Sequence, residues 1–259
     1  MMGFASKQED QKPSLTTSIV IKHGFHKVSL TLLSLLLPLS FLLLARISSP
    51  SLSSPSITLC VSYFLLLSLV GFVSLSTLYH ALTGRIPHLP LCVSWTILFI
   101  FQASVSFGIE SSFAAGVRPI TAVSTCRVPW IAYSIFFIGL YETMMTWVKA
   151  LVKPVADDTI FMSSVNDVVL DKVFVGLAYS VLWLKLLKNE MEPLVMAVRK
   201  EELVMHGGWN GLLLWLIGYA TTIAGLMKII YGAVWIMEKI LFFQCRNAED
   251  DSFLSSNPV

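Results

Sequence analysis

The sequence predicts an all-α membrane protein, a polytopic bundle of about six transmembrane helices, and three observations support this. Hydrophobic residues make up 55% of the 259 positions, and charged residues only 13%. The mean hydropathy is +0.74, whereas a soluble domain carries about 25% charged residues. The apolar residues also gather in runs close to the roughly 20 residues that a membrane-spanning helix needs. A lipid bilayer would cover this apolar surface, which in water favours aggregation.

Six hydrophobic segments within a domain 28–244 are expected to form the transmembrane helices. They cover residues 28–45, 57–78, 91–109, 130–148, 165–187 and 211–237. Pro38 is expected to kink the first helix, and Arg46 ends it. The Ser/Pro-rich link 48–56 then closes a hairpin with the second helix. The polar residues 1–27 are expected to form a disordered cytosolic tail, and the acidic residues 245–259 a second disordered tail.

The third and fourth segments are bounded by residues typical of turns and interfaces. The link 79–90 holds the Gly and Pro residues that interrupt helices. Glu110 ends the third segment. Trp130 and Trp147 stand at the two ends of the fourth, where the aromatic side chains of membrane proteins meet the headgroups.

The segment 165–187 leaves two interpretations open. Its stretch between Lys172 and Lys185 spans only about 18 Å, short of a bilayer core of about 30 Å. A capping box from Ser164 starts a longer helix at Val165, whose lysines would snorkel toward opposite interfaces. If this helix does not cross, the protein has five spans, and Lys and Arg are biased more strongly to the cytosolic side. We favour six, because the early loops dominate orientation and are the same in both arrangements.

Two ionisable residues lie inside predicted spans, Glu142 and Lys228. Charges within a bilayer are costly and by default mark a functional site or a buried pair. Lys228 shares a helix face with glycines at seven-residue spacing, where another helix can approach closely. These glycines are Gly211, Gly218, Gly225 and Gly232. Gln102 also lies on a polar face, so Glu142, Lys228 and Gln102 are expected to form a polar seam. With six spans, their depths are compatible with a Glu142–Lys228 pair.

No motif indicates a catalytic, cofactor-binding or metal site. The sequence contains no HExxH, GxSxG or P-loop, and its four cysteines form no CxxC. Asp167 and Asp171 could bind a cation, but a solvated first turn that complements the helix dipole is the interpretation we favour. Cys245, directly after the last apolar run, is a candidate for S-palmitoylation. The net charge of +2, with no basic patch, does not favour nucleic acid as a partner.

The Ser/Leu-rich opening hairpin, Leu30–Leu44 and Leu59–Leu78, resembles those of uncharacterised multi-span membrane proteins of land plants. The Gly207-Gly208-Trp209-Asn210-Gly211 start of the last helix adds to the resemblance. The resemblance spans most of the chain. It implies no activity and assigns no site residues.

Three functions follow as hypotheses for a protein located in a membrane. The first is a non-enzymatic protein that works by helix packing and partner interaction, its partners being the lipid bilayer, other membrane helices or a second copy. The second is a small transporter or channel component that uses Glu142, Gln102 and Lys228. The third and weakest is a membrane-embedded lipid-modifying enzyme with a site around His80, His88 and the region 157–171.

Overall fold

The computed structural model describes residues 12–47, 57–114, 130–160, 168–187, 195 and 208–254. Within these ranges the chain is helical except for the link 84–90, and it contains no strand. A helix satisfies its own backbone hydrogen bonds, as any segment inside lipid must. The predicted all-α class is therefore confirmed.

The helices follow one another with two short π-helical turns, η1 and η2, between them. Their bounds are α1 Lys12–Ile47, α2 Ile57–Thr83, α3 Leu91–Ala114, α4 Trp130–Trp147, η1 Val148–Val152, α5 Lys153–Ile160, α6 Val168–Leu182, η2 Trp183–Leu187 and α10 Gly208–Leu254. Within the described ranges, five helical stretches are long and apolar enough to cross a membrane. These are His23–Ile47, Ile57–Thr83, Leu91–Glu110, Trp130–Asp158 and Trp209–Gln244.

The first and last helices extend beyond the hydrophobic segments that predicted them. Residues 12–27 belong to α1 and residues 245–254 to α10, so the structure differs from the disordered tails expected there. Pro13 stands in the first turn of α1. N–H groups in this turn have no partner within the helix, so the missing N–H of proline costs no hydrogen bond. No Gly or Pro lies between Gly232 and Pro258, so nothing in the sequence stops α10 where its hydrophobic run ends.

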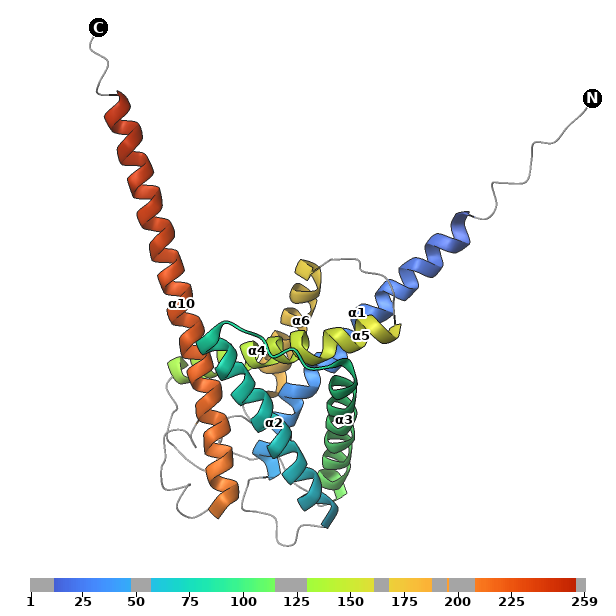
Figure 1. Ribbon diagram of the computed structural model, residues 1–259. Helices are drawn as coiled ribbons and strands as arrows, with labels where there is room; N and C mark the ends of the chain where they lie inside the picture. The colour runs from blue at the N-terminus through green and yellow to red at the C-terminus, as the bar shows by residue number, and fades with distance from the viewer. Residues whose placement is uncertain are drawn as a thin grey trace, which may run out of the picture.

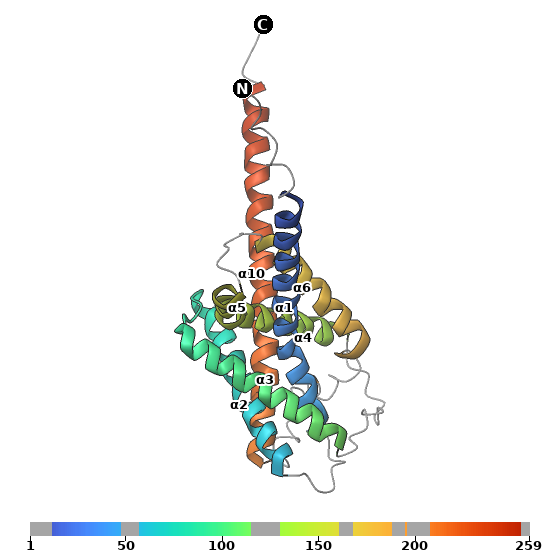
Figure 2. The ribbon, with the colours of Figure 1, turned by 90° about the vertical axis from the view of Figure 1, so that its right-hand side faces the viewer.

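Figure 1 shows that α1 begins and α10 ends on the same side of the bundle, and Figure 2 shows this from a second direction. The core lies mainly between α1, α2, α3 and α4. Its largest fully buried side chains include Leu37, Phe41, Leu66, Phe101, Phe136, Leu140, Met144 and Trp147. The Trp147 indole packs against the Phe101 ring at 4.6 Å and donates to the Leu33 carbonyl oxygen at 3.2 Å.

The helix formed by α6 and η2 corresponds to the fifth predicted span. It is about 30 Å long, but its charged residues keep it out of the five long apolar stretches. It packs beside α1 and α4, and the Tyr179 hydroxyl donates to the Phe137 carbonyl oxygen at 2.9 Å. The chain runs back along α6, which lets α10 end on the side where α1 begins (Figure 1). Whether this helix crosses the membrane, and so whether the protein has five or six spans, stays a prediction.

The helix α4 continues through η1 into α5 in spite of Pro154. A proline has no N–H, and its ring collides with the carbonyl four residues before it in a regular α-helix. The turn in front of Pro154 is widened instead, and the Lys153 N–H donates to the carbonyl oxygen of Val148, five residues earlier. The π turn thus lets one continuous helix run from Trp130 to Ile160.

Candidate functional site

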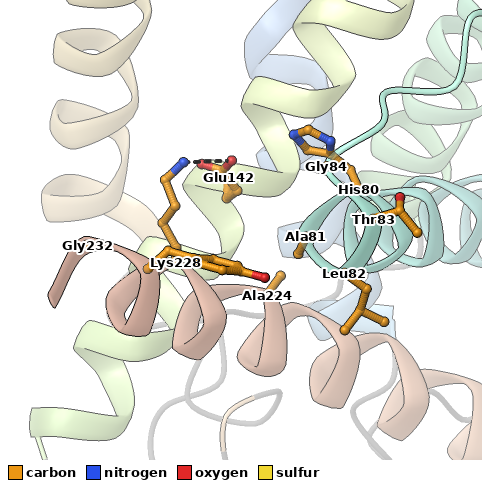
Figure 3. A pocket seen from close by; sticks show the side chains of 10 residues that line it. His80, Ala81, Leu82, Thr83, Gly84, Glu142, Ala224, Lys228 and Gly232 are labelled. Atoms are coloured by element: carbon orange, nitrogen blue, oxygen red, sulfur yellow. Dashed lines mark hydrogen bonds and ion pairs between the residues drawn. The ribbon is translucent and has the colours of Figure 1, made fainter. Parts of the chain in front are cut away.

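The helices α4 and α10 cross (Figure 3), and their backbones touch at the crossing. A Cβ atom added at Gly139 would overlap the carbonyl oxygen of Thr221. A Cβ atom added at Gly225 would overlap the carbonyl oxygen of Ile135 and lie 2.8 Å from the backbone nitrogen of Gly139. The contact therefore requires a residue without a side chain on each helix.

Only part of the predicted glycine stripe lies in this contact. Gly218 and Gly225 are buried, Gly211 is half-buried and Gly232 is exposed. A Cβ atom at Gly232 would meet nothing within 4 Å. Gly139, the partner of Gly225 on α4, was missed by the sequence analysis because a single glycine has no spacing to reveal it.

Glu142 and Lys228 meet just beyond the crossing. Each lies three residues after the contact glycine of its helix, so each side chain points from the same face, one turn further on. The Lys228 Nζ donates to the Glu142 Oε1 at 3.1 Å. The Glu142 side chain is 13% exposed and that of Lys228 is 56% exposed. The predicted pair therefore forms, but for a different reason. The prediction compared the depths of Glu142 and Lys228 on two helices lying side by side, whereas α4 in fact crosses α10 (Figure 3).

The structure does not place Gln102 with this pair. The buried face of α3 passes through Leu98, Phe101 and Val105, at helical spacing. Gln102 is next to that face but its side chain is exposed, and it does not line the pocket beside Glu142 and Lys228. Of the three residues expected in the polar seam, two come together.

A pocket of about 630 Å³ opens beside the ion pair (Figure 3). Its lining comes from the end of α2, from α4 and from α10. The lining residues are His80, Ala81, Leu82, Thr83, Gly84, Glu142, Ala224, Lys228, Tyr231 and Gly232. The helix α2 ends in the way usual for a glycine with positive φ: Gly84 has φ 70°, and its N–H donates to the His80 carbonyl oxygen at 2.8 Å.

His80 brings a third titratable group to the pocket. In Figure 3 its imidazole lies on the same side of the crossing as the Glu142 carboxylate and points toward it. The Nδ1 atom is buried and has no hydrogen-bond partner among the described residues. Sequence reasoning named His80 only for a lipid-modifying enzyme, together with His88. The structure leaves His88 exposed and outside the pocket lining.

A second set of charged contacts ties α1 to the helices that follow α4. The Lys27 Nζ donates to the Asp171 Oδ1 at 2.6 Å, with side chains 11% and 18% exposed. The His26 Nε2 lies 3.3 Å from the Asp157 Oδ1. The expected solvated first turn at Asp171 is therefore replaced by an inter-helix ion pair.

Two further expectations fall outside what the structure describes. Asp167, the proposed neighbour of Asp171 in a cation site, lies outside the described residues, and so does the side chain of Cys245. Among the residues that are described, no group of three His, Cys, Asp or Glu side chains could hold a metal ion.

Comparisons of the chain with protein-family models, with curated proteins and with solved structures find no match. The resemblance of the opening hairpin to multi-span membrane proteins of land plants stays a prediction.

Proposed function

We propose that this chain is a non-enzymatic multi-pass membrane protein that works by binding other membrane proteins through the outer half of α10. The observation that supports the proposal is the exposure of this half. Among the α10 residues whose side chains are described, the last buried one is Gly225. From there the helix continues away from the bundle (Figures 1 and 2), on the side where α1 begins.

In the outer half of α10, residues 234–243 present apolar side chains on every side of the helix. Four consecutive residues, Val234–Met237, are exposed, and so are the four residues 240–243. Successive residues turn by about 100°, so four of them cover the whole circumference of a helix. The charges between them, Glu238 and Lys239, are exposed as well. A helix that is hydrophobic all round needs lipid or protein around it.

The length of α10 indicates that protein, and not lipid alone, covers part of this surface. The helical stretch Trp209–Gln244, which includes Lys228, Glu238 and Lys239, has 36 residues. Such a helix is about 54 Å long, against a bilayer core of about 30 Å. Tilting would fit it into the core only at roughly 56°, beyond the range of about 0–40° seen for transmembrane helices. Partner helices that cover the excess are the arrangement we propose.

The proposal is tested by photo-crosslinking in the native membrane. A photoreactive residue at Ile236 should give an adduct with one discrete partner protein. The matched control is Val61 on α2, which is also exposed and apolar. Lipid adducts alone at both positions would contradict partner binding through α10.

A small transporter or channel component is the second candidate, and the pocket beside the Glu142–Lys228 pair favours it. In proteoliposomes, proton flux followed with a pH-sensitive dye should then be abolished by Glu142→Gln while the helix content and elution volume stay those of the wild type. If partner binding is the function, the same substitution is tolerated or lowers only the stability. Flux that Glu142→Gln leaves unchanged removes the transporter candidate.

A further inference from the structure

We propose that the pocket between α2, α4 and α10 binds a protonated primary amine attached to an apolar body, and that the ammonium group of Lys228 occupies the amine position until such a ligand displaces it. The inference is independent of partner binding through α10, because it concerns the pocket between α2, α4 and α10 and not the exposed residues 234–243. It rests on the charges around the pocket, on its size and on the unequal exposure of the ion pair.

The fixed groups of the pocket favour a cation over an anion. Glu142 contributes a carboxylate that is 13% exposed. The end of α2, from His80 to Gly84, forms one wall, and the carbonyl groups at a helix C-terminus carry partial negative charge. The buried Nδ1 of His80 has no partner among the described residues. In the tautomer with its proton on Nε2, this atom accepts a hydrogen bond, and a primary ammonium has three to give.

The size and walls of the pocket indicate an organic ligand. A volume of about 630 Å³ far exceeds that of a single metal ion and falls within the range of about 300–1,000 Å³ usual for small-molecule sites. Ala81, Leu82 and Ala224 provide an apolar lining, and Tyr231 adds an aromatic ring, to which cations are attracted. An ammonium group on an apolar body matches both the charged and the apolar part.

Lys228 is the movable partner of the pair. Its side chain is 56% exposed, so its flexible stem can swing outward without crossing packed atoms. Glu142 is held on α4 near the crossing, where the backbones touch. An incoming ammonium can therefore take over the Oε1 of Glu142 while the Lys228 ammonium moves away. The net charge of the site stays the same during this exchange.

The experiment measures binding of benzylamine, protonated at neutral pH, to the full chain in phosphatidylglycerol nanodiscs by calorimetry. Benzoate is the anionic control. Wild-type protein should bind benzylamine and not benzoate. Lys228→Gln should tighten binding at least tenfold, because the internal competitor is removed. Glu142→Gln should weaken it at least tenfold, since it replaces the carboxylate that accepts a charge-assisted hydrogen bond from the ammonium group.

Two variants keep the test decisive. Lys228→Arg retains a competing cation and should bind like the wild type. Lys185→Gln removes an exposed lysine that does not line the pocket and should change nothing. The cation site is overturned if benzylamine binds no better than benzoate in both wild type and Lys228→Gln, or if Glu142→Gln binds as tightly as the wild type.

The same ammonium chemistry occurs in free amines and in phosphatidylethanolamine headgroups. Nanodiscs that also contain phosphatidylethanolamine distinguish these sources. Weaker apparent binding of benzylamine there supports a site occupied by the lipid headgroup, and unchanged binding supports a site for a free amine. Either outcome leaves partner binding by α10 untouched, so the two proposals can fail separately.

Discussion

Gly139 and Gly225 set the geometry from which the site follows. Their lack of side chains lets α4 and α10 touch at a crossing, and the third residue after each glycine then projects beside it. Those third residues are Glu142 and Lys228, which form an ion pair at 3.1 Å. Two small residues thus position two charged ones that lie far apart in the sequence.

Alanine substitutions separate the contact glycine from its neighbour in the stripe. Gly225→Ala should lower the free energy of unfolding by roughly 1–3 kcal/mol, because its Cβ atom overlaps a backbone carbonyl that cannot move alone. Gly232→Ala is the matched control: nothing lies within 4 Å of its Cβ, and alanine favours a helix by up to about 1 kcal/mol. Unfolding in detergent, followed by tryptophan fluorescence, measures both. Equal stability of the two variants would contradict the close crossing.

At the scale of elements, α6 stays with the bundle through specific contacts. One end is joined to α1 by the Lys27–Asp171 ion pair. Further along, Tyr179 is fully buried and its ring stacks on Phe137 at 5.0 Å, while Trp183 meets Phe137 edge-on at 5.1 Å. The ion pair and the aromatic packing therefore hold α6 in the bundle, because its apolar stretch is too short to do so by itself.

Asp171→Asn tests the connection between α6 and α1. It should lower the free energy of unfolding by about 1.5–3 kcal/mol, the usual contribution of a hydrogen bond to a charged group. Lys172→Gln, at the exposed neighbouring position, should change it by no more than about 0.5 kcal/mol. Chemical unfolding in mixed micelles gives both values. The ion pair has no structural role if the two variants lose equal stability.

Tyr179→Phe tests the contact between α6 and α4. The substitution keeps the ring but removes the hydroxyl that donates to the Phe137 carbonyl oxygen, so we expect a loss of about 0.5–1.5 kcal/mol. Tyr219→Phe, on the exposed side of α10, should stay within about 0.5 kcal/mol of the wild type. Thermal unfolding monitored by circular dichroism compares them. A Tyr179→Phe protein as stable as the wild type would mean that the contact between α6 and α4 depends on ring packing and not on this hydrogen bond.

At the scale of the whole molecule, we predict an even number of membrane crossings from where the first and last helices leave the bundle. The beginning of α1 and the end of α10 lie on the same side of the bundle in both views (Figures 1 and 2). In the part of the chain that the structure describes, five helical stretches are long and apolar enough to cross a membrane by themselves. The helix α6 has a shorter apolar stretch than these five. It leads the chain from α5 back toward the side of the bundle where α10 begins.

Accessibility tags in sealed vesicles test this path. Tags at the N-terminus and the C-terminus should react from the same side of the membrane, and a tag within 189–204 from the other. A tag near Glu110, which should lie with the 189–204 tag, checks that the vesicles are uniformly oriented. If the 189–204 tag and the N-terminal tag react from one side and the C-terminal tag from the other, five spans are established.

The sequence by itself determined the all-α membrane class and the residues at which α2, α3 and α4 begin. Long apolar runs and the Gly and Pro residues between them act locally, so they can be read without the fold. The tertiary structure decided which polar groups meet. Helical periodicity places Gln102 on a face of its own helix, but the neighbours of that face depend on how helices cross. That crossing depends on Gly139, whose effect exists only once α10 lies against it.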